Sequence, residues 1–320
     1  MTTLNHTNAP AATTLRAHQL VIDDRIAFVE DWGDIDATPL LAVHTAGQSG
    51  VQYRHVAADL AALGYRVIVP DLPGHGRTEP AKNGPVTDLG EYARFGLTVL
   101  DQLGIDRFVA VGCSIGGKIT IDLAVRAGDR IIAAIAMAAG SRPGHVSLRG
   151  LTRELVDIST PSRGDRTYWG TRAVVGSAID EERRELIARM HCREDPIVSN
   201  SDLIGWGRHD VSEGLPGVVC PTVLVAGEDD LWIDTAAIRR DAESIHRGTF
   251  VLLPGIGHYP MEEMPDFAEA VDSWVRSADT RGADTDSADT DLPDSGSADI
   301  DSADAGSADR KTEELEAARS

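Results

Sequence analysis

Residues 107–116, with the sequence RFVAVGCSIG, decide the fold of this chain. The apolar run from Phe108 to Val111 is typical of a strand buried on both faces of a sheet. It leads into a G-x-S-x-G motif around Ser114, and a helical pattern follows over residues 115–127. A strand that turns into a helix at a serine between glycines is the setting of a nucleophile elbow, which exposes the serine hydroxyl. The sequence therefore predicts Ser114 as a nucleophile.

Apolar runs of strand length continue on both sides of this stretch, and helical patterns separate them. Residues 20–32 predict a hairpin that turns near Asp23 and Asp24. Further strands are predicted at 39–45, 65–71, 131–139, 222–230 and 249–255, and helices at 51–63, 88–103, 115–127, 234–246 and 262–276. This alternation predicts an α/β fold, with a doubly wound, mainly parallel sheet between two layers of helices.

One long interval departs from this alternation. Residues 142–218 contain several helical patterns but no clear strand, so we expect a helical cap inserted between two core strands. The core is then formed by residues 19–141 and 219–276. Residues 1–18 are polar and predict a flexible arm. Residues 277–320 repeat SAD units with few apolar side chains and predict a disordered acidic tail.

The charge of the chain narrows the expected partners. The 320 residues carry a formal net charge of −21, and no basic stripe is visible, so neither nucleic acid nor an anionic membrane surface is an expected partner. The first residues lack an apolar signal segment, and the longest apolar run, Ile131 to Ala139, is too short to span a bilayer. We therefore expect a cytoplasmic protein. Its oligomeric state is not predictable from the sequence.

A nucleophilic serine needs a base, and the base needs an orienting acid. His258 lies in PGIGHYP (254–260), directly after the last predicted strand. The sequence GEDD (227–230) follows another strand and offers Asp229 and Asp230 as the acid. Each candidate therefore lies at the carboxyl end of a predicted strand, which is where ligands bind in open α/β sheets.

These motifs resemble those of the α/β-hydrolase superfamily, in its serine-nucleophile, cap-bearing form. The resemblance covers about residues 19–276 and rests on GCSIG (112–116), GEDD (227–230) and GIGHYPMEEMP (255–265), with DLPGHGRT (71–78) similar to a structural turn of the family. It implies that Asp230, three residues after Gly227, is the acid of a Ser114–His258–Asp230 triad.

The resemblance also implies an oxyanion hole. One donor is expected to be the N–H of Ile115, directly after the nucleophile, and the other the N–H of Ala46. The loop that contains Ala46 departs from the family pattern, because His44 is present but Thr45 replaces the usual glycine. We expect His44 and Gln48 to line the substrate pocket. Trp169 and Trp206, in the predicted cap, either wall the same pocket or form the core of the cap.

The predicted function is that of a serine hydrolase, without cofactor or metal, that acts on a small-molecule carbonyl compound. An ester, a lactone or a C–C bond next to a carbonyl all fit this machinery, and the sequence does not choose among them. Two alternatives stay open. One is a cofactor-independent perhydrolase or haloperoxidase that uses the same triad, and the other is a ligand receptor that retains the triad.

Overall fold

The computed structural model describes residues 13–156 and 163–286 of the chain. An eight-stranded sheet crosses this part of the molecule in the order β1-β2-β4-β3-β5-β6-β7-β8. Strands β3 to β8 are parallel, whereas β2 pairs antiparallel with both β1 and β4. The predicted mainly parallel sheet is therefore confirmed. The strands are β1 (Leu15–Ile22), β2 (Arg25–Trp32), β3 (Thr38–Val43), β4 (Tyr65–Pro70), β5 (Phe108–Cys113), β6 (Ile131–Met137), β7 (Thr222–Gly227) and β8 (Gly248–Leu253).

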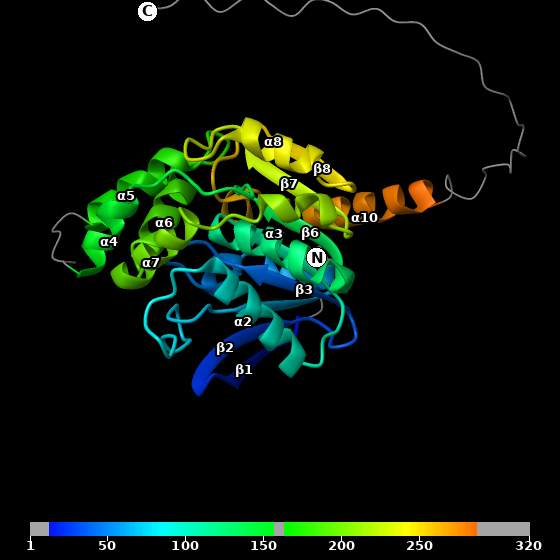
Figure 1. Ribbon diagram of the computed structural model, residues 1–320, viewed down its shortest axis with the longest axis horizontal. Coiled ribbons are helices and arrows are strands. Elements are labelled where there is room, and N and C mark those ends of the chain that lie inside the picture. Colours follow the sequence, from blue (N-terminus) through cyan, green and yellow to red (C-terminus); the bar gives the residue numbers. More distant parts are fainter. Residues whose placement is uncertain (1–12, 157–162, 287–320) are drawn as a thin grey trace, which may run out of the picture.

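Helices cover both faces of the sheet (Figure 1). One face packs against α2, α3 and α8, and the other against α1 and α10. This is the predicted doubly wound arrangement. The helices are α1 (Ala57–Ala62), α2 (Leu89–Gln102), α3 (Ile115–Ala127), α4 (Leu148–Val156), α5 (Arg163–Val174), α6 (Glu181–His191), α7 (Pro196–Trp206), α8 (Thr235–Glu243), α9 (Pro260–Glu263) and α10 (Phe267–Asp286), with short 3-10 turns η1 (Gly50–Tyr53), η2 (Gly128–Arg130) and η3 (Ser212–Gly217).

The strands β5 and β7 lie inside the sheet, and all six residues of each are buried. Burial on both faces explains why their sequences are continuous apolar runs. The hairpin of β1 and β2 turns at Asp23 and Asp24, whose φ angles are +52° and +61°. Positive φ at both central residues is the geometry of the tight hairpin turn that aspartate tolerates.

The N-terminal boundary predicted from the sequence is wrong by a few residues. Strand β1 begins at Leu15, inside the segment 1–18 that was predicted as a flexible arm. Its polar side chains obscured the strand, because Arg16 and His18 reach across to the buried Asp31 on β2, with contacts of 2.8 and 3.0 Å. Burial would raise the pKa of Asp31, but hydrogen bonds from Arg16, Arg66 and His18 outweigh it and lower the pKa to about 2.

The C-terminal boundary also needs correction. Helix α10 continues to Asp286, so residues 277–286 are helical rather than part of a disordered tail. The helix is anchored by Phe267, Val271 and Val275, which are buried against the sheet. Extending an anchored helix requires no new nucleation, so a polar sequence can continue it. Residues 287–320, and residues 1–12 of the predicted arm, lie outside the described residues.

The interval 142–218 contributes α4, α5, α6, α7 and η3 between β6 and β7. Among its described residues the structure places no strand. Helix α5 packs against α6, and α4 against α7. Figure 1 shows these four helices grouped at one end of the sheet.

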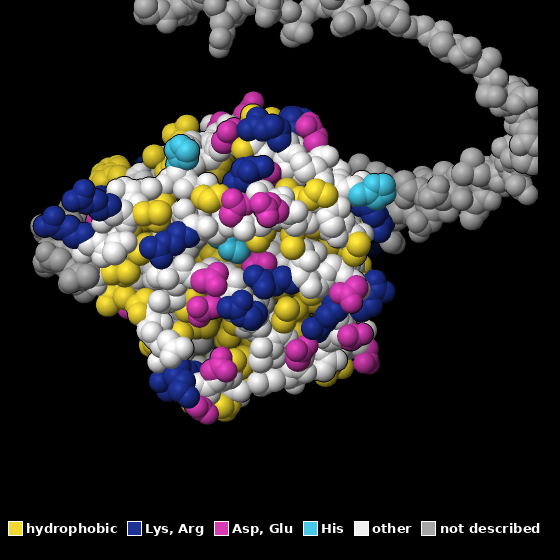
Figure 2. Space-filling view, in the orientation of Figure 1, with side chains coloured by type: hydrophobic (Ala, Val, Ile, Leu, Met, Phe, Trp, Pro, Cys, Tyr) yellow, Lys and Arg dark blue, Asp and Glu magenta, His cyan; other side chains and the backbone are white. Residues whose placement is uncertain are grey.

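On the face drawn in Figure 2, acidic and basic side chains are interspersed over the core.

Candidate active site

The nucleophile candidate occupies the turn between β5 and α3. Ser114 has φ +57° and ψ −118°, a strained conformation for a residue with a side chain. The turn is tight enough to require its glycines. A Cβ on Gly112 would lie 2.1 Å from the carbonyl oxygen of Gly116, and one on Gly116 would lie 2.3 Å from that of Val43. The G-x-S-x-G pattern is therefore explained by backbone packing around Ser114.

His258 and Asp230 form a buried pair. The Nδ1 atom of His258 lies 2.5 Å from Oδ2 of Asp230, and both side chains are almost fully buried. The other carboxylate oxygen of Asp230 accepts the backbone N–H of Trp232 at 2.9 Å. Because the carboxylate accepts a hydrogen bond from the Nδ1–H group, the proton of the neutral ring stays on Nδ1 and Nε2 of His258 is left as the basic nitrogen. This is the tautomer that a general base requires.

The neighbouring aspartate has a different partner. The carboxylate of Asp229 accepts the backbone N–H of Ser177 at 2.7 Å, and hydrogen bonding from the side chain and the backbone of Ser177 lowers the pKa of Asp229. Of the two aspartates, Asp230 is the one whose carboxylate contacts the ring of His258. The structure therefore places the aspartate three residues after Gly227 against the histidine, as the motif implied.

The loop that holds His258 is anchored by a glutamate that sequence reasoning did not single out. The buried carboxylate of Glu263 accepts the backbone N–H groups of Gly257 and Tyr259, at 2.6 and 2.9 Å, on either side of the histidine. It also accepts the N–H of Gly176, at 2.9 Å. The signal lay within GIGHYPMEEMP, as a carboxylate close to a glycine-rich turn.

Ser114 and His258 line the same cavity, whose volume is about 360 Å³. The helical interval supplies much of its wall, with apolar and polar side chains both represented. The residues that line it include Ala46, Gln48, Val146, Leu151, Ser199, Asn200, Leu203, Trp206 and Trp232. Trp232 was missed from the sequence, although it lies two residues after Asp230. Its ring meets that of His258 edge-on, with the ring centroids 4.9 Å apart.

Two predicted pocket residues lie elsewhere. His44 is buried but does not line the cavity: its Nδ1 donates to the carbonyl of Thr45 at 2.9 Å, and its Nε2 accepts the N–H of Leu72 at 3.1 Å. Burial, together with the charge of His75, lowers the pKa of His44 to about 4, so this ring is neutral and structural. Trp169 is 63% exposed and does not line the cavity either. Both predictions are wrong, because neither the motif position of His44 nor the aromatic character of Trp169 reveals which way the side chain packs.

Of the two predicted oxyanion donors, Ile115 directly follows the nucleophile and Ala46 lines the same cavity. Ile115 is the first residue of α3, where backbone N–H groups have no acceptor within the helix. Ala46 lines the cavity together with Ser114. Gln48 also lines it, and so does Trp206, for which the sequence left the pocket wall and the core of the cap open. The helix N-terminus adds a favourable field for a developing negative charge.

Trp206 is held from behind by a buried lysine. The Lys118 ammonium lies 4.6 Å from the centre of the Trp206 ring and donates to the carbonyls of Gly140 and Arg142. Burial lowers the pKa of Lys118 to about 8. The position of this cavity wall therefore depends on a charged group in the core.

Within residues 13–156 and 163–286, no cluster of three or more His, Cys, Asp or Glu side chains could hold a metal ion. In the same part of the chain, every helix is too short or too polar to cross a bilayer.

Comparison with known proteins agrees with this geometry. Residues 40–271 match the family model described as the alpha/beta hydrolase family. The chain belongs to the α/β-hydrolase family. It is 25% identical over 254 residues to a non-heme chloroperoxidase from Burkholderia pyrrocinia. The aligned region covers 72% of this chain and 88% of the chloroperoxidase.

Solved α/β-hydrolase structures share the fold. A thermophilic esterase from Thermogutta terrifontis superposes with a TM-score of 0.71 at 23% identity, covering 84% of this chain and 99% of the esterase. An enol-lactonase from Burkholderia xenovorans LB400 gives a TM-score of 0.72 at 20% identity, covering 81% of this chain and all of the lactonase. These superpositions show the fold, and the family match identifies the chain as an α/β-fold hydrolase.

Proposed function

We propose that this α/β-hydrolase cleaves an ester, a lactone or a C–C bond next to a carbonyl in a small molecule, with Ser114 as nucleophile, His258 as base and Asp230 as orienting acid. The observation that carries the proposal is the 2.5 Å bond between His258 and Asp230 in the cavity that Ser114 enters from a strained turn. The tight turn between β5 and α3 fixes Ser114 at the carboxyl end of β5.

In the proposed reaction, Nε2 of His258 takes the hydroxyl proton of Ser114 as the oxygen attacks the substrate carbonyl carbon. The N–H groups of Ile115 and Ala46 stabilise the oxyanion that forms. The proton passes from His258 to the leaving group, and an acyl-enzyme remains on Ser114. A water molecule, deprotonated by His258, then attacks the acyl carbon and releases the acid and the serine.

The cavity supports a compact substrate. Its volume of about 360 Å³ lies at the lower end of the range for small-molecule sites. We propose that the interval 142–218 acts as a cap, because α5 and α7 both contribute lining residues over the serine. A cap of this kind obstructs an extended polymer. Apolar residues such as Leu151, Leu203 and Trp206 then contact the carbon skeleton of the substrate.

The test is a kinetic panel of short p-nitrophenyl esters, lactones and vinylogous ketone substrates, run on the wild-type protein and on Ser114→Ala. We expect turnover in at least one class, and loss of about 10⁴-fold or more in kcat/KM in the variant, since the triad acts as a unit. Equal turnover by a folded Ser114→Ala variant would contradict the proposal. Labelling of Ser114 without turnover of any class would favour a receptor instead.

A second candidate reaction has support from a specific observation. The chain is similar to the chloroperoxidase above and, at 23% identity over 271 residues, to a bifunctional esterase/perhydrolase from Acinetobacter calcoaceticus. In a perhydrolase, peroxide replaces water in the second step, so the same triad serves. Peracetic acid formed from acetate and hydrogen peroxide would oxidise added bromide to hypobromite, so bromination of an indicator would detect this activity. Its dependence on acetate would distinguish it from redox chemistry.

A further inference from the structure

Asp202 is a buried carboxylate at the contact between the helical interval and the core. It lies on α7 with no exposed surface, and it accepts three hydrogen bonds, each of 2.8 Å. Its Oδ2 accepts the backbone N–H of Gly47 and the ring Nε2–H of His75, and its Oδ1 accepts the hydroxyl of Tyr92. A buried charge is tolerated only when it is bonded in this way.

One of these donors is a cation. Both ring nitrogens of His75 face acceptors, since Nδ1 lies 3.2 Å from the carbonyl oxygen of Pro73 and Nε2 faces Asp202. Two N–H donors require the imidazolium form. Burial would lower the pKa of His75, but the charge of Asp202 outweighs it and the pKa is raised. Asp202 and His75 therefore form a buried ion pair that fixes the carboxylate in place.

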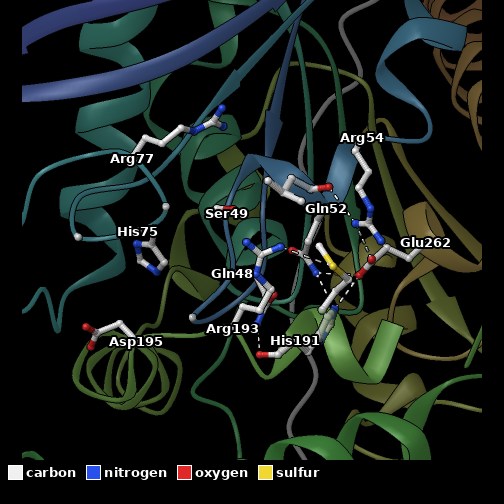
Figure 3. A pocket seen from close by; sticks show the side chains of 15 residues that line it. Gln48, Ser49, Gln52, Arg54, His75, Arg77, His191, Arg193, Asp195 and Glu262 are labelled. Atoms are coloured by element: carbon white, nitrogen blue, oxygen red, sulfur yellow. Dashed lines mark hydrogen bonds and ion pairs between the residues drawn. The ribbon is translucent and has the colours of Figure 1, made fainter. Parts of the chain in front are cut away.

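The loop after β3 that contains Thr45, Ala46 and Gly47 is also held from its other side. The backbone N–H and the hydroxyl of Thr45 both donate to Oε1 of Gln52, at 2.8 and 3.0 Å. The amide of Gln52 in turn donates to Glu262, which also bonds His191 and Arg54. Figure 3 shows this cluster on one side of a neighbouring cavity of about 480 Å³, with His75 across the cavity and Gln48 between them.

Ala46 thus lies between two anchored residues. Thr45 is fixed through Gln52, and Gly47 is fixed through Asp202. The hydroxyl of Thr45 adds a second bond to Gln52, which a glycine at this position could not make. With both neighbours held, the peptide groups that flank Ala46 have little freedom to turn, so the direction of the Ala46 N–H is set by these two contacts.

We propose that Asp202 is a positioning residue that aims the oxyanion donor Ala46 at the reacting carbonyl; this inference rests on the proposed function. The same helix α7 contributes Ser199, Asn200, Leu203 and Trp206 to the substrate cavity. Helix α7 therefore lines the proposed substrate cavity and also holds the loop that contains Ala46. The loop is in its working geometry only when the helical interval is packed on the core.

The test compares three variants of the full chain with p-nitrophenyl esters as the probe. Asp202→Ala removes the acceptor for Gly47, and we expect kcat to fall by about 10- to 100-fold with KM within about twofold, somewhat less than the loss of a complete oxyanion donor. Asp202→Asn keeps an oxygen that can accept from Gly47, so it should retain kcat to within about fivefold. Tyr92→Phe removes only the bond to the other oxygen, and its kcat should stay within about twofold.

A second readout separates positioning from general destabilisation. A boronic acid forms a tetrahedral adduct on a catalytic serine and mimics the charged intermediate. In Asp202→Ala its inhibition constant should weaken in proportion to kcat/KM, while product inhibition by the carboxylic acid stays unchanged. If Asp202→Ala does not fold, Asp202→Glu keeps the charge but displaces the carboxylate, and the same loss of kcat is expected.

Three outcomes contradict the inference. The first is a folded Asp202→Ala or Asp202→Glu variant with unchanged kcat. The second is an equal loss of kcat in Tyr92→Phe, and the third is a boronic acid affinity that does not change. Ser114→Ala in the same series separates this inference from the proposed function. Turnover that depends on Ser114 but not on Asp202 contradicts the positioning role alone, whereas turnover that survives in Ser114→Ala contradicts both.

Discussion

Replacement of Asp230 by asparagine tests how the structure selects the tautomer of His258. One carboxylate oxygen of Asp230 accepts the backbone N–H of Trp232 at 2.9 Å, and the other faces Nδ1 of His258 at 2.5 Å. In Asp230→Asn the amide oxygen must stay with the Trp232 N–H, since an NH₂ group cannot accept that bond. The amide NH₂ then faces Nδ1 of His258 and donates to it. The proton of the ring moves to Nε2, which can no longer act as a base.

The magnitude follows from this change of tautomer. In serine hydrolases with the same arrangement, an asparagine in place of the acid lowers kcat by about 10⁴-fold, or about 5 kcal/mol of transition-state stabilisation. The matched control is Asp229→Asn. The Asp229 carboxylate accepts the N–H of Ser177, a bond that the asparagine oxygen can keep, so kcat should change by less than about threefold.

The assay is steady-state hydrolysis of the best p-nitrophenyl ester from the panel by purified wild-type protein and both variants. Circular dichroism and thermal melting of each variant establish that the fold is retained. Equal losses in the two variants, or a larger loss in Asp229→Asn, would refute the assignment of the acid. A loss in Asp230→Asn below about tenfold would refute the tautomer argument.

Three further predictions concern the surroundings of the site. Because burial lowers the pKa of Lys118 from 10.5 to about 8, unfolding takes up a proton at pH values between 8 and 10.5. The free energy of unfolding of the wild type, relative to Lys118→Met, should therefore rise by about 3 kcal/mol from pH 8 to pH 10.5 in urea titrations. A difference that stays constant over this pH range would contradict the prediction. Trp206→Ala should raise the kcat/KM ratio of longer to shorter acyl esters by about tenfold, since the ring walls the cavity, and an unchanged ratio would show that the acyl group lies elsewhere. Removal of residues 287–320, which contain four SAD units, should change Tm by less than about 2 °C and leave kcat/KM unchanged. A larger shift in Tm would mean that this segment docks on the domain.

Much of the fold was predictable because each buried strand has a continuous apolar sequence. Strands such as β5 and β7 have no exposed face, so pattern and burial coincide. Strand β1 was placed too late because it lies at the edge of the sheet, where Arg16 and His18 are used for bonds to Asp31. The end of α10 was placed too early because a helix anchored at one end tolerates a polar continuation.

The site was predictable only where a motif fixes the backbone. The G-x-S-x-G turn and the spacing from Gly227 to Asp230 are local features, and the structure has Ser114 in that turn and Asp230 against His258. His44 is also in a motif, but its orientation depends on the backbone N–H of Leu72, 28 residues away. Asp202 gave no signal at all, because its partners come from segments up to 155 residues distant in the sequence. Contacts of this kind arise from tertiary packing and not from local pattern.

The central claim, that Ser114 forms a covalent acyl intermediate, is tested most directly by acid-quenched mass spectrometry. Enzyme at high concentration is mixed with an activated ester, quenched within milliseconds, digested and mapped. The account predicts one acyl group per chain, located on Ser114, appearing with the burst of released alcohol and absent from Ser114→Ala. Turnover without an acyl adduct, or an adduct on another residue that decays at the rate of turnover, would contradict it.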